Sequence, residues 1–386
     1  MAGNWPNSKV NLNLWAGTVA ETDASETALM RLALGLAARG LYTTDPNPRV
    51  GCVLAHGDHV VGEGWHERCG EAHAEVHALR QAGANARDST AYVTLEPCAH
   101  HGRTPPCADA LIKAGIARVV VATVDPFPAV AGAGVARLRA AGVEVEVGML
   151  GGEAQALNPG FFSRLTRQRP WVRVKLGMSL DARTALADGR SQWITGSAAR
   201  ADVQHWRARS SAILTGIDSV LADDPRLSVR LTPECAHLIP TRIILDTHAR
   251  LPANARLLAE PGSILWVTAQ EAPARTELDD RVVRLRLQTS AGRIDLQALL
   301  RQLAKRDCNE LLVEAGATLA GAFVEAGLVD ELILYLAPCL LGDDARAAFR
   351  LPPLAELDQA RRWQWHRVDA VGNDLRLILR PTASEA

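Results

Sequence analysis

Apolar and polar positions alternate along the chain in two successive series of short strands and helices. In the first series, helical spacing of Leu29, Leu32, Ala33 and Leu36 indicates a helix after residue 23. Further helices are expected over 74–81, 107–113 and 135–140, with strands over 50–55, 60–61, 91–95, 119–124 and 143–147. Strands that alternate with helices predict an α/β layer fold.

A second alternating series starts at Trp171. Its expected strands are 172–176, 212–215, 242–245, 264–267, 310–313 and 331–336, and its expected helices lie near 198–209, 217–222 and 295–305. Residues 1–22 are polar and lack periodicity, so we expect a flexible leader. The predicted division is therefore a leader over 1–22, one domain over 23–150, a linker over 151–167 and a second domain over 168–386.

Composition narrows the class of protein. The 386 residues suit two or three domains, and 42 basic against 43 acidic side chains leave a net charge of −1. That balance argues against a nucleic-acid or membrane-surface partner, which would require a surplus of cations. The longest strongly apolar run, 119–124, is far below the roughly 20 residues that span a bilayer. Seven scattered cysteines argue against a disulfide framework, so we expect a cytoplasmic protein with reduced thiols.

The strongest chemical signal lies between residues 73 and 107. His73 is followed by Glu75, then by a Pro97-Cys98 pair, then by Cys107 at the start of an expected helix. One His and two Cys form a three-ligand zinc set that leaves the fourth tetrahedral position open, as in catalytic sites. This order, with the Glu as a proton carrier that does not bind the metal, is typical of zinc nucleobase deaminases. Glu75 is therefore the candidate acid/base.

Structural interpretations of these residues, without catalysis, stay open at this point. A lone His-x-Glu is commonly a surface feature of a helix, two cysteines nine positions apart commonly pack in a core, and a purely structural zinc is an alternative. His77 lies four residues after His73 and could suggest a two-His ligand pair, but the His/Cys/Cys set makes that pair unnecessary.

The first half resembles the deaminase part of the bifunctional deaminase/reductase family of riboflavin biosynthesis. The matching segments are TTDPNPRVGCVL (43–54), GEGWH (62–66), GEAHAEVHAL (70–79), YVTLEPCAHHGRTPPCADALIKAG (92–115) and DPFPAVAGAG (125–134). The resemblance implies a cytidine-deaminase-like α/β/α domain with one zinc held by His73, Cys98 and Cys107. It also implies substrate contacts from Asn47, His66, His100 and Arg103. Phe127 departs from the family, which usually has Asn there.

No usual nucleotide fingerprint occurs in the second half. A GxGxxG after a strand and a GxxxxGK[ST] loop are both absent. The expected strand 310–313 does run into Glu314-Ala315-Gly316 and then a helix start, which is an anion-binding geometry. Such turns are common in α/β folds, so the turn alone is a weak signal.

The wider pattern of the second half resembles the reductase part of the same family. The matching segments are KLGMSLDARTAL (175–186), SQWIT (191–195), VLADDPRLSVR (220–230), EAGATLAGAF (314–323) and DELILYLAPCLLG (330–342). The resemblance implies a dihydrofolate-reductase-like α/β fold that uses NADPH. Ala182 and Ala317 stand where the family commonly has Gly and Pro.

The same resemblance supplies the site residues of this half. It implies contacts to the sugar phosphate substrate from Ser191, Arg207, Leu227, Arg230 and Glu314. It implies contacts to NADPH from Gly177, Trp193, Thr195, Ser219, Asp223, Thr247 and the turn Gly316, Ala317, Thr318, Leu319, Ala320 and Gly321. Lys175, Asp223 and Glu314 have the chemistry to protonate a sugar imine or carbonyl as hydride arrives.

The sequence thus predicts a bifunctional enzyme. The first domain would deaminate a diaminopyrimidinone that carries a phosphoribosylamino group, and the second would reduce the ribosyl group to ribityl with NADPH. Two rivals are a deaminase with a catalytically inactive second half and a non-enzymatic zinc-stabilised binding protein. The resemblance also implies a homodimer or homotetramer.

Overall fold

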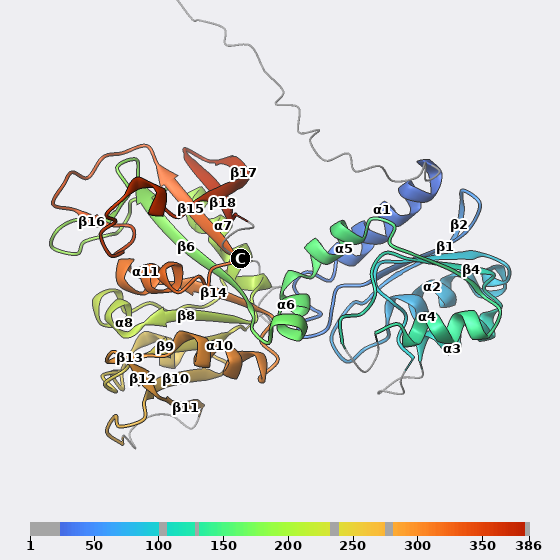
Figure 1. The fold of residues 1–386 in the computed structure, drawn as a ribbon, viewed down its shortest axis with the longest axis horizontal. Coiled ribbons are helices and arrows are strands. Elements are labelled where there is room, and N and C mark those ends of the chain that lie inside the picture. Colours follow the sequence, from blue (N-terminus) through green and yellow to red (C-terminus); the bar gives the residue numbers. More distant parts are fainter. Residues whose placement is uncertain (1–23, 100–105, 128–130, 232–238, 275–280, 383–386) are drawn as a thin grey trace, which may run out of the picture.

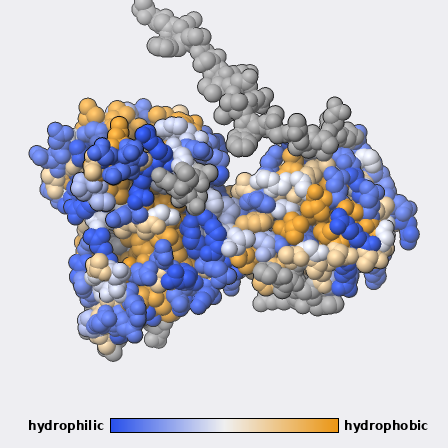
Figure 2. Space-filling model, viewed as in Figure 1, coloured by the Kyte–Doolittle hydropathy of each residue, from blue (hydrophilic) through white to orange (hydrophobic). Residues whose placement is uncertain are grey.

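The computed structural model describes residues 24–99, 106–127, 131–231, 239–274 and 281–382, which form two units, each built on one large sheet (Figure 1). The expected leader, His100 and Arg103 lie outside the described residues. In the view of Figure 2, polar residues cover much of both units and apolar patches lie on each. Within the described ranges, no helix is long and apolar enough to cross a membrane.

The N-terminal unit is a five-stranded sheet between two helical layers. The order is β2-β1-β3-β4-β5, with β1 Gly51–His56, β2 His59–Trp65, β3 Thr90–Val93, β4 Arg118–Val121 and β5 Glu144–Val147. Strand β1 is antiparallel to β2 and β3, while β3, β4 and β5 are parallel. The helices are α1 Ala24–Ala38, α2 Ala74–Ala82, α3 Cys107–Ala114 and α4 Ala133–Ala140, with a 3-10 turn over Gly83–Ala86.

Strand periodicity explains the two layers. Cys52 and Leu54 of β1 pack on the α2–α3–α4 side, whereas Val53 packs with α1 on the other face. Helix α2 lies close against β2, because a Cβ at Gly64 would come within 2.2 Å of the Ala74 carbonyl oxygen. This close approach seats the start of α2 on the sheet.

The C-terminal unit is a nine-stranded sheet of order β11-β10-β9-β8-β14-β6-β15-β18-β17. Its strands are β6 Trp171–Ser179, β8 Ala212–Gly216, β9 Thr241–Leu245, β10 Ile264–Ala269, β11 Val282–Leu287, β14 Glu310–Glu314, β15 Glu331–Ala337, β17 Trp363–Val371 and β18 Asp374–Pro381. The first seven in the sheet are parallel, and β18 and β17 are antiparallel. Two small pairs complete it: β7 Arg183–Ala185 with β16 Arg346–Ala347, and β12 Thr289–Ser290 with β13 Arg293–Ile294.

Helices cover both faces of this second sheet. Helices α10 Leu296–Ala304 and α11 Ala317–Glu325 share the main core with β6, while α7 Ser197–Arg209, α8 Ile217–Asp223 and α9 Arg256–Ala259 belong to the two smaller cores. A 3-10 turn over Leu357–Gln359 precedes β17. Ala182, where the family commonly has Gly, has a φ of 55°, so it adopts the left-handed backbone that glycine favours.

The segment expected to link the domains is helical. It forms α5 Gly151–Leu157 and α6 Pro159–Arg167, where the sequence analysis placed no helix. Helix α5 contacts α1, and α6 contacts β6 and β14, so α6 lies between the two sheets (Figure 1). The residue between them, Asn158, accepts from the Arg49 backbone N–H at 2.8 Å and donates to its carbonyl at 2.9 Å. This segment therefore packs against both units.

One carboxylate joins the units. Glu310, the first residue of β14, is 1% exposed and binds Arg49 of the N-terminal unit together with Arg173 and Arg209 of its own sheet. The Arg49 Nη1–Glu310 Oε1 distance is 2.8 Å. Burial alone would raise the pKa of Glu310, but the three guanidiniums outweigh it and hold that pKa well below its usual value.

We predict that Glu310→Gln lowers the free energy of unfolding by about 3–5 kcal/mol, because three buried guanidiniums lose their common counter-ion. Urea unfolding of the full chain measures this. Glu144→Gln is the matched control, since Glu144 pairs with Arg118 but is 75% exposed, and it should cost less than about 1 kcal/mol. Equal effects of the two substitutions would contradict the prediction.

The contribution of Glu310 to stability should also depend on pH. Because the pKa of Glu310 is depressed on folding, its contribution should be present above about pH 4.5 and fade as the pH falls further.

Candidate active sites

Three ligand atoms meet at one end of the first sheet. His73 directly precedes α2 with extended backbone (φ −77°, ψ 165°), Cys98 follows β3, and Cys107 is the first residue of α3, as the sequence predicted. The ligand atoms of these residues lie within 4.8 Å of one another, and they form the one such ligand cluster in the described chain. His73 Nδ1 is 3.3 Å from Cys107 Sγ and 3.7 Å from Cys98 Sγ. Tetrahedral zinc with usual bond lengths requires N–S spacings of about 3.6 Å, so the three residues fit zinc.

The thiols are arranged to favour a thiolate. A hydrogen bond with the Cys107 side chain is the main reason why the pKa of Cys98 is lowered to about 4, although burial acts in the opposite direction. The backbone N–H of Cys107 also donates to Cys98 Sγ at 3.3 Å. The thiolate is the form that binds a metal.

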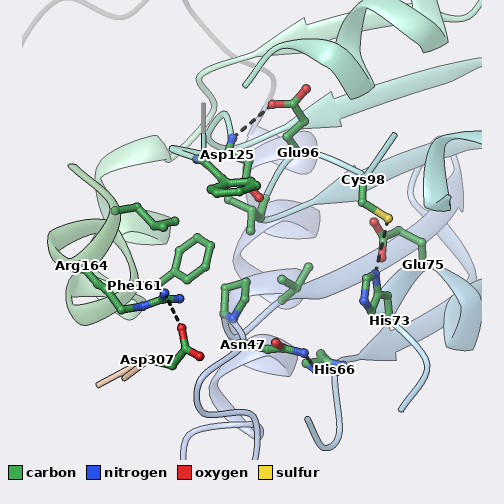
Figure 3. Close-up of a pocket in the computed structure, with 15 residues that line it drawn as sticks. Asn47, His66, His73, Glu75, Glu96, Cys98, Asp125, Phe161, Arg164 and Asp307 are labelled. Carbon is green, nitrogen blue, oxygen red and sulfur yellow. Dashed lines mark hydrogen bonds and ion pairs between the residues drawn. The ribbon is translucent and has the colours of Figure 1, made fainter. Parts of the chain in front are cut away.

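Glu75 lies in the first turn of α2, beside His73 and Cys98 (Figure 3). It is buried, and among the described residues its Oε2 has no hydrogen-bond partner. Burial is the main cause that raises the pKa of this carboxyl, and it outweighs the opposing effect of His73. An unpartnered buried carboxyl oxygen beside a metal site can take up and release a proton.

A cavity of about 440 Å³ opens beside the three ligands (Figure 3). His66 Nδ1 lies 3.1 Å from the Ala72 carbonyl oxygen, so this nitrogen carries the proton and donates. His66 Nε2 then accepts from Asn47 Nδ2 at 3.1 Å. Asn47 keeps its amide oxygen as an acceptor for a ligand, and burial lowers the pKa of His66, which favours its neutral form.

The sequence analysis missed part of the cavity lining. Phe161, Arg164 and Leu165 of α6 and Asp307 of the second unit line it, and no local motif marks them. Glu96 also lines it and accepts four backbone N–H groups, from Asp125, Gly132, Gly134 and Val135. Phe127 faces the cavity and is 44% exposed. A loop residue such as Asp307 enters this cavity only because the two units pack together.

A second cluster lies toward the carboxyl ends of the parallel strands in the second sheet. Glu314, the last residue of β14, accepts from Arg207 at 2.6 and 3.0 Å and lies 3.2 Å from Lys175 Nζ of β6. Burial alone would raise the pKa of Glu314, but Arg207 and Lys175 outweigh it and lower that pKa. Glu314 is therefore a carboxylate at neutral pH. In open α/β sheets, ligands bind at this edge.

The loop after α8 joins this cluster. Arg207 Nη1 donates to the Ser228 carbonyl at 3.0 Å, and the Arg230 N–H donates to Gln204 of α7 at 2.8 Å. Leu227 is buried and has a φ of 52°. The structure thus brings Arg207, Glu314 and the 227–230 loop together, whereas Ser191 lies on the loop before α7.

The expected cofactor residues lie on several connections of the same sheet. A Cβ at Gly177 would come within 3.2 Å of Thr195 Cγ2, so these two are neighbours. The exposed Trp193 ring lies 4.5 Å from the Arg200 guanidinium carbon. Ser219 and Asp223 lie on α8, and Thr247 follows β9.

The glycine turn divides into two parts. Gly316 precedes α11, and a Cβ there would meet nothing within 4 Å among the described atoms, so its backbone faces open space. Ala317, Thr318 and Leu319 form the first turn of α11. Ala320 is completely buried, and a Cβ at Gly321 would lie 2.1 Å from the Arg350 carbonyl oxygen. The open backbone at Gly316 fits the approach of a phosphate group, and Gly321 instead permits close packing.

A zinc-type ligand set beside a buried glutamate, followed by a parallel sheet with an open helix start, defines a deaminase joined to a reductase. Family comparisons agree. Residues 23–123 match the cytidine and deoxycytidylate deaminase zinc-binding region, and residues 170–377 match the RibD C-terminal domain. The chain belongs to the RibD family, and it is a bifunctional deaminase and reductase of riboflavin biosynthesis.

Individual relatives cover nearly the whole chain. The riboflavin biosynthesis protein RibD of Escherichia coli (strain K12) is 50% identical over 360 residues, which is 91% of this chain and 98% of the relative. The solved structure of Acinetobacter baumannii RibD (form 1) has a TM-score of 0.86 at 49% identity and covers 93% of this chain and 99% of that one. A deaminase/reductase structure from Thermotoga maritima has a TM-score of 0.81 at 31% identity, over 92% and 99%.

We predict that the purified protein holds one zinc per chain and that Cys98→Ala removes it, because two ligands do not complete the site. Cys69→Ala is the control, since Cys69 is exposed and outside the cluster, and it should keep the full metal content. Elemental analysis after dialysis measures both. Retention of one zinc by Cys98→Ala would contradict the assignment.

Proposed function

We propose that the first site hydrolytically deaminates 2,5-diamino-6-(5-phosphoribosylamino)pyrimidin-4-one and that the second site reduces the ribosyl group of the product to ribityl with NADPH. The Thermotoga maritima relative is described as a diaminohydroxyphosphoribosylaminopyrimidine deaminase and 5-amino-6-(5-phosphoribosylamino)uracil reductase. The observation that carries the proposal is the buried, unpartnered Glu75 oxygen between His73 and Cys98 in a cavity of about 440 Å³.

In the first site, this chain's residues hold the ring and move a proton. Zinc, when bound by His73, Cys98 and Cys107, supplies a water acidified to a pKa of roughly 7. Glu75 takes one proton at Oε2 and passes it to a ring nitrogen, and it then carries a second proton, from the oxygen that becomes the new carbonyl, to the amino group, which leaves as ammonia as its bond to the ring carbon breaks. The Asn47 amide oxygen accepts from a ring N–H, and His66 keeps the Asn47 side chain in that orientation. His100 and Arg103 are the further proposed contacts to the ring and the ribose phosphate.

In the second site, NADPH supplies the hydride. Lys175 is the residue best suited to donate the accompanying proton, because Glu314 is held as a carboxylate by Arg207 and Lys175. Glu314 therefore orients Lys175 and the sugar hydroxyls. Asp223, whose pKa is raised by burial, is the second candidate donor. Arg207 and Arg230 suit the substrate phosphate, together with Ser191 and Leu227.

NADPH would lie along the carboxyl edge of the second sheet. Gly316 to Leu319 offer backbone N–H groups at a helix start, where phosphate binds well. Ala320 and Gly321 act by packing this helix. Gly177, Trp193, Thr195, Ser219, Asp223 and Thr247 are the other proposed contacts.

Assembly and location are also proposed. Trp365, Val368 and Leu375 on β17 and β18 are exposed apolar residues at the edge of the sheet, which favours a homo-oligomer. Sedimentation equilibrium tests this, and a monomer would contradict it.

Zinc-binding thiols must stay reduced, which favours the cytoplasm. We also propose that the first domain ends at residue 150 and that the second begins at residue 168.

We predict that Glu75→Gln lowers the deamination rate by about 10²–10⁴-fold, because it removes the proton carrier without changing the ligands. Zinc content and NADPH oxidation with the already deaminated substrate should stay near those of the wild type. Unchanged ammonia release by the variant would contradict the role of Glu75, whereas absence of ammonia release from the wild type would favour a non-enzymatic zinc protein.

We further predict that the wild-type enzyme, given the undeaminated substrate, releases ammonia and oxidises NADPH. Lys175→Met should keep ammonia release and lose NADPH oxidation by about 10²-fold or more, because the proton donor is gone. Ammonia release and NADPH absorbance, followed together, measure both steps. Ammonia without NADPH oxidation in the wild type would indicate a deaminase with an inactive second half.

A further inference from the structure

The first cavity has two chemically different ends. His73, Glu75 and Cys98 lie together at one end, and Arg164 and Phe161 of α6 lie at the opposite end (Figure 3). Among the described residues that line the cavity, Arg164 is the only Lys or Arg. A permanent positive charge therefore faces the end that is remote from the metal ligands.

Arg164 is held in place by the second unit. Its Nε donates to Asn309 Oδ1 at 2.7 Å, and its Nη1 donates to Asp307 Oδ1 at 2.8 Å. Within the described part of the chain, no partner is recorded for Nη2. The side chain is 15% exposed, so two residues next to β14 fix a largely buried guanidinium while one nitrogen stays available.

The substrate also has two chemically different ends, which suit the two ends of the cavity. The carbon that loses its amino group must lie at the metal ligands, so the phosphoribosylamino group extends away from them. The phosphate is a dianion, and a guanidinium fork is the side chain that binds it best. We propose that Arg164 binds the 5′-phosphate of the deaminase substrate. This inference rests on the function proposed above, and it makes α6 part of the deaminase site.

Asp307 opposes this binding. Its carboxylate pairs with Arg164 and is 66% exposed, so it competes with a phosphate for the same guanidinium. Neutralising Asp307 should therefore favour the phosphate, whereas neutralising Arg164 should weaken its binding. The two partners of one ion pair make a matched test with opposite signs.

Deamination by the full-length, zinc-loaded enzyme tests the proposal, with the phosphorylated substrate and its dephosphorylated analogue compared. For Arg164→Gln we expect kcat/KM with the phosphorylated substrate to fall by roughly 10- to 100-fold, mainly through KM, as for loss of a charge-assisted hydrogen bond. The value for the dephosphorylated analogue should stay within about twofold of the wild type. Arg164→Lys should restore part of the loss, and Asp307→Asn should leave KM unchanged or lower it.

NADPH oxidation with the deaminated substrate reports the folding of each variant, because it uses the other site. Equal losses with both deaminase substrates, or no loss with either, would overturn the role of Arg164. A rise in KM with Asp307→Asn that equals that of Arg164→Gln would also overturn it, because the pair would then act only as structure. Absence of deamination in the wild type would instead overturn the proposed function itself.

Discussion

Both sites depend on the ion pairs that the buried Glu310 carboxylate forms with three arginines. Glu310 lies at the start of the central strand β14 and binds Arg173 and Arg209 of its own unit and Arg49 of the other. Arg49 lies two residues after Asn47, so the ion pair fixes the loop that brings Asn47 to the cavity. Asp45 of the same loop accepts from Ser211 and Asn309, each at 3.0 Å. The deaminase pocket is thus held by the reductase sheet, and neither unit is a passive support for the other.

The same strand separates the two reactions. Before β14, Asp307 lines the deaminase cavity and Asn309 binds Arg164 of the same cavity, whereas Glu314 ends β14 and belongs to the proposed reductase site. The deaminase cavity therefore borders the amino ends of the strands of the second sheet, and the cluster around Glu314 lies at their carboxyl ends. None of the described residues that line the deaminase cavity belongs to the reductase cluster around Glu314. With the two sites assigned as proposed, a product that leaves the first site starts near the amino ends of these strands and must reach their carboxyl ends.

Local chemistry decided what could be predicted from the sequence. The zinc ligands and Glu75 were identifiable because a metal restricts residue type and spacing, and the alternating strands predicted both sheets. Strands β11, β17 and β18 were not predicted. In β17, apolar and polar residues alternate from Trp363 to His366, but the alternation shifts at the bulge between Trp365 and Arg367, and the strand is mostly exposed. Helix α6 was missed although its Phe161 is buried, and Arg164 and Asp307 became site residues only through packing of segments about 140 positions apart. Such contacts are tertiary, and no short motif records them.

Two glutamates show how surroundings assign opposite roles to one residue type. Glu75 and Glu314 are both deeply buried, and burial raises the pKa of each. At Glu75 burial outweighs the nearby His73, which is the largest opposing cause, so the pKa of this carboxyl stays above its usual value. At Glu314 the guanidinium of Arg207 and the ammonium of Lys175 outweigh burial, so this carboxyl stays anionic. Burial raises the pKa of both carboxyls, and the number of cations within hydrogen-bond reach decides which one can hold a proton and which one stays an anion.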